Sequence, residues 1–205
     1  MVLGLALLPG RNCLRPLRFG SSSEQVAGVG EQVAEDRTAT FTSTMSALPK
    51  TPETTATIRF QDCDPFNHLN NGRYTDYFLN AREDHLLEAY DFDLYGIANT
   101  TGRTWVVSTS QIAYLRPAIL MEKVVISSQL ITYSPKHVEV EMQMWDKEKK
   151  VLKALCWMSF VHFDLRTNRS AEHIPEHMEL FERVCLPVEE KAFDLRVKGL
   201  RSKVV

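Results

Sequence analysis

The stretch IRFQDCDPFNHLNNGRYTDYFLNAREDHLL, residues 58–87, decides the fold. A short β-type run over residues 56–60 leads into a polar turn, and the turn leads into a run with helical spacing. Four residues of that run share one helix face and predict a helix over residues 71–90: Tyr74, Tyr77, Phe78 and Ala81. A strand, a polar turn and a helix in this order place carboxylates beside a helix N-terminus. Free backbone N–H groups there can bind an anion or polarise a carbonyl group.

The polar turn gathers five groups capable of chemistry within ten residues: Asp62, Asp64, His68, Asn70 and Asn71. Taken singly, such residues usually cap a helix or stabilise a turn without any chemistry. Their density at a strand-to-helix junction favours a functional site instead. No metal site is predicted, because Phe66 and Arg73 stand where a calcium-binding loop needs an oxygen ligand and its final glutamate.

Composition predicts one globular domain with a tail. The chain has 205 residues, 44% of them hydrophobic, and a net charge of -2. This balance does not indicate a nucleic-acid or membrane partner, and no apolar run is long enough to span a bilayer. The four cysteines are scattered, which favours free thiols in a reducing compartment: Cys13, Cys63, Cys156 and Cys185.

The first 44 residues differ from the rest. Residues 1–23 carry three arginines, a serine cluster and no acidic residue, as in a mitochondrial transit peptide. An overlong start is the alternative, because Met45 directly precedes the folded pattern. We expect residues 1–44 to be a disordered extension in either case. The predicted location is the cytoplasm, or the mitochondrion if the extension is a transit peptide.

The remaining pattern predicts an α+β fold. Strands are expected at residues 104–115, 123–133, 138–144 and 151–163, linked by turns as an antiparallel sheet with the long helix on one face. The last of these strands is apolar on both faces, which predicts a central strand or one at a subunit contact. Residues 91–102 are interpreted as a connection that ends in turn-forming residues. Short helices are expected at residues 175–184 and 188–198.

The turn and the start of the helix resemble hotdog-fold acyl-CoA thioesterases of the 4-hydroxybenzoyl-CoA thioesterase type. The residues that carry the resemblance are Asp62 and Asp64, then His68-Leu69-Asn70-Asn71-Gly72-Arg73-Tyr74, then Tyr77, Phe78, Ala81 and Arg82. The motif also resembles that of plant acyl-ACP thioesterases, so it does not fix the acyl carrier. The resemblance implies a hotdog domain over residues 45–168, an antiparallel sheet wrapped around one central helix, followed by a helical extension over residues 169–205.

The resemblance also implies roles for the turn residues. Asp64 would be the catalytic base or nucleophile, and the backbone amide of Asn71 would polarise the thioester carbonyl. His68 is expected to assist catalysis or orient the turn. Three further residues are expected to contact substrate: Asn70, Gly72 and Tyr74. Two departures are Leu79, where the family often has an acidic residue, and Met121-Glu122, which replaces a frequent Gly-Asp pair.

The expected activity is therefore hydrolysis of an acyl-CoA thioester, without a cofactor, by a homodimer or a tetramer of dimers. An acyl-ACP thioesterase and a non-catalytic acyl-CoA-binding hotdog protein are the alternatives. A serine hydrolase is not expected, since no Gly-x-Ser-x-Gly motif is present. His173 and His177 are four residues apart, but no metal site is expected there, because Pro175 lies between them at a predicted helix start. His85 and His162 are expected to be buried core histidines.

Overall fold

The computed structural model describes residues 47–203, so the extension predicted for residues 1–44 lies outside the described part of the chain. The elements follow in the order β1 (Glu53–Thr57), η1 (Phe60–Asp62), η2 (Asn71–Arg73), α1 (Tyr74–Tyr90), α2 (Leu94–Thr101), β2 (Arg103–Tyr114), β3 (Lys123–Tyr133), β4 (His137–Asp146), β5 (Leu152–Asp164), β6 (Arg169–Ser170), α3 (Pro175–Val184) and α4 (Phe193–Lys203). No helix within the described residues is long and apolar enough to cross a membrane.

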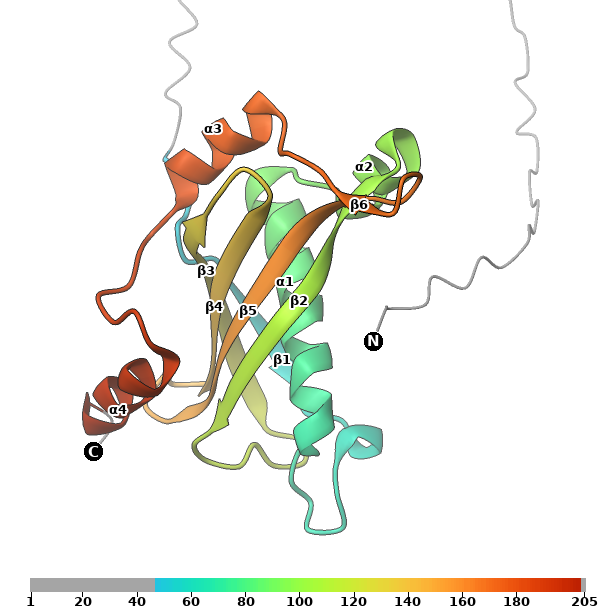
Figure 1. The fold of residues 1–205 in the computed structure, drawn as a ribbon. Helices are drawn as coiled ribbons and strands as arrows, with labels where there is room; N and C mark the ends of the chain where they lie inside the picture. Colours follow the sequence, from blue (N-terminus) through green and yellow to red (C-terminus); the bar gives the residue numbers. More distant parts are fainter. Residues whose placement is uncertain (1–46, 204–205) are drawn as a thin grey trace, which may run out of the picture. The chain divides into compact units, whose positions relative to one another are not determined.

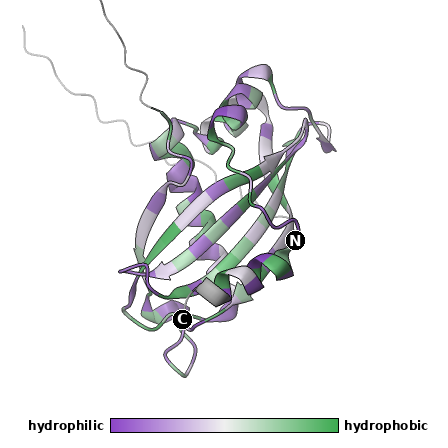
Figure 2. Cartoon of the chain, turned by 90° about the vertical axis from the view of Figure 1, so that its left-hand side faces the viewer, coloured by the Kyte–Doolittle hydropathy of each residue, from purple (hydrophilic) through white to green (hydrophobic). Residues whose placement is uncertain are grey.

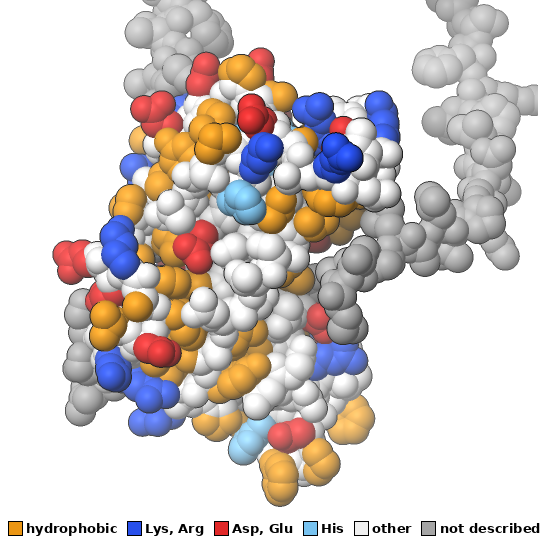
Figure 3. Space-filling model, viewed as in Figure 1, with side chains coloured by type: hydrophobic (Ala, Val, Ile, Leu, Met, Phe, Trp, Pro, Cys, Tyr) orange, Lys and Arg blue, Asp and Glu red, His pale blue; other side chains and the backbone are white. Residues whose placement is uncertain are grey.

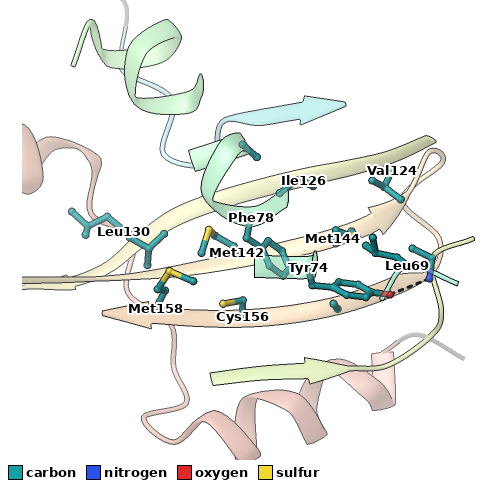
Figure 4. Packing of buried hydrophobic residues seen from close by; sticks show 14 of the residues in the cluster. Leu69, Tyr74, Phe78, Val124, Ile126, Leu130, Met142, Met144, Cys156 and Met158 are labelled. Carbon is teal, nitrogen blue, oxygen red and sulfur yellow. Dashed lines mark hydrogen bonds between the residues drawn. The ribbon is translucent and has the colours of Figure 1, made fainter. Parts of the chain in front are cut away.

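The strands form one antiparallel sheet in the order β1-β3-β4-β5-β2, and β6 pairs with β5. The long helix α1 lies along one face of this sheet (Figure 1). Phe78 of α1 packs there among apolar side chains of the three central strands, including Ile126, Met142 and Cys156 (Figure 4). The α+β architecture and the antiparallel sheet with one long helix are thus confirmed.

The predicted strand at residues 56–60 is wrong in its position. The strand β1 is Glu53–Thr57, five residues that pair with β3. The next residue, Ile58, is fully buried and donates its N–H to the Glu122 carbonyl at 2.9 Å. The chain then bends, and Phe60–Asp62 form a 3-10 turn. Ile58 is buried like a strand residue but lies beyond the last residue that pairs with β3. The apolar pattern therefore continues past the end of the strand.

The connection predicted for residues 91–102 contains the helix α2. Its N-terminus is capped by Asp93, whose Oδ1 accepts hydrogen bonds from the N–H groups of Tyr95 and Gly96 at 3.0 and 2.9 Å. Gly102 ends the helix with φ 71°. The helix is only eight residues long and contains one glycine and two threonines, so its intrinsic propensity is low and the cap is needed to start it.

The strand β5 is covered on both faces, as predicted. Ala154, Cys156 and Met158 belong to the core cluster beneath α1. The alternate residues Leu155 and Trp157 are buried on the opposite face, against side chains of the C-terminal segment. Figure 2 looks onto the side of the molecule that carries α4. The outer cover is therefore supplied by the same chain.

The C-terminal helix begins later than predicted, at Phe193 instead of residue 188. A buried ion pair fixes it to the sheet. Arg196 Nε and Nη2 donate to the two carboxylate oxygens of Glu141 at 2.9 and 2.8 Å, and Glu141 lies on β4 with no exposed side-chain surface. Trp157 Nε1 donates to the same carboxylate at 2.7 Å. This network ties α4, β4 and β5 together.

His85 and His162 are buried, as expected. His85 Nδ1 lies 2.8 Å from Ser128 Oγ, which also accepts a hydrogen bond from buried Arg82. His162 stacks on both Trp105 and His173, whose ring centroids lie 5.8 Å from each other. Trp105 Nε1 donates to His173 Nε2 at 3.0 Å, so this imidazole is neutral and its Nδ1–H faces the Ser134 carbonyl. No cluster of residues within 47–203 has the arrangement needed to hold a metal ion.

These histidines make the stability of the fold pH-dependent. Burial, aided by the Arg82 charge, lowers the pKa of His85 to about 4, and burial beside His162 lowers that of His173 to about 4. The unfolded state, with histidine pKa values of about 6.5, binds more protons between these limits. We expect the free energy of unfolding to fall by roughly 1–2 kcal/mol per histidine from about pH 7 to about pH 5.

Urea titrations at several pH values measure this loss. His173→Gln should flatten the pH dependence, whereas the same change at His137, which is exposed, should alter the slope much less. A free energy of unfolding that stays constant over this pH range would contradict the assignment of neutral, buried imidazoles.

Candidate active site

The polar turn is a short hairpin closed by backbone hydrogen bonds. Asp64 N donates to the His68 carbonyl at 2.8 Å, and Asn70 N donates to the Asp62 carbonyl at 2.9 Å. Cys63 and Leu69 form an isolated β-bridge between them. The two ends of the motif, separated in sequence, are therefore side by side: Asp62 lies next to Asn70 at the start of the helical segment, and Asp64 lies two residues further along the hairpin, opposite His68.

The carboxylate of Asp64 is held by the turn itself. Its Oδ1 accepts hydrogen bonds from Phe66 N at 2.9 Å and from His68 N at 3.0 Å. Its Oδ2 accepts none from the described residues, and the residue is half-buried. One oxygen thus fixes the orientation of the group, and the other remains available to a water molecule or a substrate carbon.

The helical segment begins with one free donor. Asn70 caps it, because its Oδ1 accepts a hydrogen bond from Gly72 N at 2.9 Å. Asn71 is the first residue of the turn η2, so no helix carbonyl precedes it, and its N–H donates to no residue of the described chain. The N–H expected to polarise a carbonyl is therefore free at Asn71, whereas the N–H of Gly72 is engaged.

Asp62, the other aspartate, is held by the side chains of Tyr77 and Arg73, for which the sequence predicted no role at the site. The hydroxyl of Tyr77 donates to Asp62 Oδ2 at 2.9 Å and accepts a hydrogen bond from Arg59 N at 3.1 Å. Arg73 Nε lies 3.8 Å from Asp62 Oδ1. Both oxygens of Asp62 thus face structural partners. The sequence contained one indication of this contact. Tyr77 is an aromatic residue with a hydroxyl group on the inner face of the predicted helix.

Tyr74 lies in the core with 2% of its surface exposed. Its hydroxyl accepts a hydrogen bond from Ala118 N at 3.2 Å, drawn as a dashed line in Figure 4. Burial raises the pKa of this hydroxyl. Its ring meets that of Tyr114 edge-on at 5.1 Å, and the Tyr114 hydroxyl donates to the Asn71 carbonyl at 3.0 Å. Tyr114, at the end of β2, was not identified from the sequence, because only the fold brings it to the turn.

His68 is half-buried, and only its backbone takes part in the turn. Its imidazole makes no hydrogen bond to the described residues. It also forms an isolated β-bridge with Ile119, from the connection between β2 and β3. The roles expected for His68, Asn70, Gly72 and Tyr74 stay predictions.

The connection between β2 and β3 borders the site. It contains Met121-Glu122, the pair that departs from the Gly-Asp frequent in the family. Glu122 Oε2 accepts a hydrogen bond from Ile119 N at 2.9 Å, and its Oε1 pairs with Lys153 at 2.7 Å. Met121, at the position before it, has φ 65°, a left-handed conformation that glycine adopts more easily. The glutamate thus closes this turn.

The site thus combines an antiparallel sheet and one long helix with a short hairpin, bearing Asp62 and Asp64, that leads into the first turn of the helical segment. The chain belongs to the thioesterase-like superfamily, whose family model matches residues 58–181. The resemblance found in the motif is thereby confirmed.

Individual relatives agree. The chain is similar to the long-chain acyl-CoA thioesterase FadM of Escherichia coli, with 27% identity over 132 residues, 64% of this chain and 98% of FadM. The crystal structure of the Escherichia coli YbaW probable thioesterase matches with a TM-score of 0.56 and 26% identity, covering 65% of this chain and 98% of YbaW. The Staphylococcus aureus protein SAV2348, solved in complex with CoA, has a TM-score of 0.62 at 14% identity, covering 72% and 93% of the two chains, and supports the hotdog fold alone.

Proposed function

We propose that the protein is an acyl-CoA thioesterase, which hydrolyses an acyl-CoA to the free acid and CoA. Membership of the thioesterase-like superfamily and the likeness to FadM over nearly its whole length support this activity. The observation that carries the proposal is the arrangement at the turn. A fixed carboxylate with one free oxygen lies in the short hairpin that leads directly to the free N–H of Asn71.

The chemistry follows from these two groups. The Asn71 N–H donates a hydrogen bond to the thioester oxygen and stabilises the negative charge that develops on it. Asp64 takes a proton from water as the water attacks the carbonyl carbon. The carbon–sulfur bond then breaks, and Asp64 passes its proton to the departing thiolate of CoA. In the alternative route, Asp64 attacks the carbon directly and expels the thiolate of CoA, and water then hydrolyses the resulting anhydride to the free acid and the Asp64 carboxylate.

The other motif residues support this arrangement in our proposal. Asn70 fixes the helix start through Gly72 N, and His68 holds Asp64 through its backbone and faces the substrate with its imidazole. Tyr74 anchors the connection at Ala118, so any contact with substrate would be made through that connection.

The open edge of β2 supports a homodimer. β2 is the last strand of the sheet, twelve residues long, and residues 107–111 in its middle are exposed. An unpaired edge of this length favours pairing with a second copy. Through Tyr114, the same strand touches Asn71, so the site would lie beside that contact. Light scattering on the purified full chain tests this, and a monomeric mass would contradict it.

Two further parts of the interpretation remain proposals. Residues 45–168 would form the catalytic domain and residues 169–205 its helical extension. We also propose a reducing compartment such as the cytoplasm, supported by the free thiols of Cys63, Cys156 and Cys185.

The direct test is a panel of acyl-CoAs of different chain length and polarity, with detection of the released thiol. We expect turnover with at least one class of acyl-CoA. Turnover of the same acyl group only on acyl carrier protein would favour the acyl-ACP thioesterase. Tight binding of acyl-CoA without any turnover would favour a non-catalytic binding protein.

A further inference from the structure

Four large apolar side chains are exposed together at the end of the molecule that carries the turn: Phe60 (79% exposed), Phe66 (77%), Met121 (65%) and Ile119 (49%). We call this group the apolar tip. It comes from two loops, the turn that contains Asp64 and the connection between β2 and β3. Figure 1 shows both loops at the lower end of the sheet, and Figure 3 shows hydrophobic side chains gathered there.

The two loops form one body. Leu120 N donates to the Asn67 carbonyl at 2.9 Å, and Met121 N donates to the Ile58 carbonyl at 3.0 Å. The bridge between His68 and Ile119 adds a third link. Because the backbone is cross-linked on both sides of the tip, its apolar side chains cannot fold back into the core by a simple loop movement. Exposed apolar groups held in this way mark a surface that meets an apolar partner.

The charges around the tip are asymmetric. Of the nearby acidic groups, Asp62 bonds to Tyr77 and Glu122 pairs with Lys153, while Asp64 belongs to the site and is held through one oxygen by the backbone of the turn. The neighbouring basic groups Arg59, Arg116 and Lys123 are exposed and form no ion pair with another residue of 47–203. The tip therefore presents apolar side chains within a rim of unpaired positive charge.

We propose that the apolar tip inserts into the surface of a bilayer that contains anionic phospholipids. Aromatic and aliphatic side chains enter the boundary between headgroups and acyl chains, while basic side chains bind the anionic headgroups. A stable protein–protein interface buries about 800 Å² on each partner, more than four side chains on two loops offer. The overall charge and hydropathy of the chain do not indicate this partner, because the feature is local.

This binding goes beyond the proposed function and does not require it. If the protein is a thioesterase, the tip brings Asp64 to the layer in which the acyl chains of amphiphilic thioesters reside. The tip and the site share one loop, since Phe66 N itself donates to Asp64 Oδ1.

The test is co-sedimentation of the full chain with vesicles. We expect binding to vesicles of phosphatidylcholine mixed with phosphatidylglycerol, and weaker binding to phosphatidylcholine alone. The double variant Phe60→Ser/Phe66→Ser should weaken binding to the mixed vesicles by about tenfold or more, and high salt should weaken binding of the unchanged protein. The control is Leu195→Ser, which removes an apolar side chain of α4 that is 56% exposed and lies outside the tip, and which should bind like the unchanged protein.

Three results would overturn the proposal. One is the absence of binding to the mixed vesicles, and a second is equal binding by the double variant. The third is a change in the solution mass of the double variant, since the tip would then be a contact between copies of the chain. Circular dichroism and melting confirm that the variant is folded. Release of CoA from a short-chain substrate without vesicles tests the proposed function separately, so its failure is distinguishable from failure of membrane binding.

Discussion

Replacing Asp64 with asparagine should lower kcat for thioester hydrolysis by roughly a hundredfold to ten-thousandfold, the usual contribution of a positioned base. The asparagine Oδ1 can still accept the hydrogen bonds from Phe66 N and His68 N, so the turn should persist. What is lost is the charge on the oxygen that faces no protein donor. Asp64→Ala should reduce kcat equally. However, it leaves two N–H groups of the turn without an acceptor, at a cost of about 1–3 kcal/mol.

The matched control is Asp62→Asn in the same turn. Asp62 faces Tyr77 and Arg73, so its replacement should lower the melting temperature. The decrease in kcat should be smaller than that caused by Asp64→Asn. Hydrolysis rates and thermal melting of both variants, measured side by side, decide between the two aspartates. If Asp64→Asn keeps more than about a tenth of the rate while Asp62→Asn is folded and inactive, the base has been assigned to the wrong residue.

The sequence was informative about the site because the site is local. Asp64, the cap Asn70 and the free N–H of Asn71 lie within eight residues, and their arrangement depends on turn and helix-start geometry that short motifs encode. The strands β2 to β5 could also be predicted from the sequence, because each is an alternating or continuous apolar run bounded by turn residues.

The features that were missed depend on contacts between distant segments. Tyr114 contacts Asn71 across 43 residues, and Lys153 of β5 pairs with Glu122 in the connection between β2 and β3. No short-range pattern in the sequence predicts such contacts. The helix α2 was missed for a different reason, because a cap at Asp93 rather than an apolar repeat starts it. The boundary of β1 was misplaced since Ile58 is buried beyond the last paired residue.

The outer face of β5 gives the largest expected effect on stability. Leu155 is fully buried against Val197 and Leu200, and Trp157 is packed against Phe193 and Val188. A carboxylate at either position would lose its hydration without gaining a cation. At Trp157 it would also lie beside the buried carboxylate of Glu141, whose charge Arg196 already compensates. We therefore expect Leu155→Glu and Trp157→Glu each to destabilise the fold by several kcal/mol, about 3–5 kcal/mol for an uncompensated buried charge.

Urea unfolding of the full chain measures this loss of unfolding free energy. If a variant does not fold, the yield of folded protein is measured instead. Trp157→Phe separates packing from charge, because it keeps most of the apolar contact and loses only the hydrogen bond to Glu141, at about 1–2 kcal/mol. Leu195→Glu adds the same carboxylate to the exposed face of α4 and should change the free energy of unfolding by no more than about 0.5 kcal/mol. If Leu155→Glu and Trp157→Glu were as stable as Leu195→Glu, the C-terminal segment would not cover this face in solution. The second buried face of β5 would then need a cover from outside the chain.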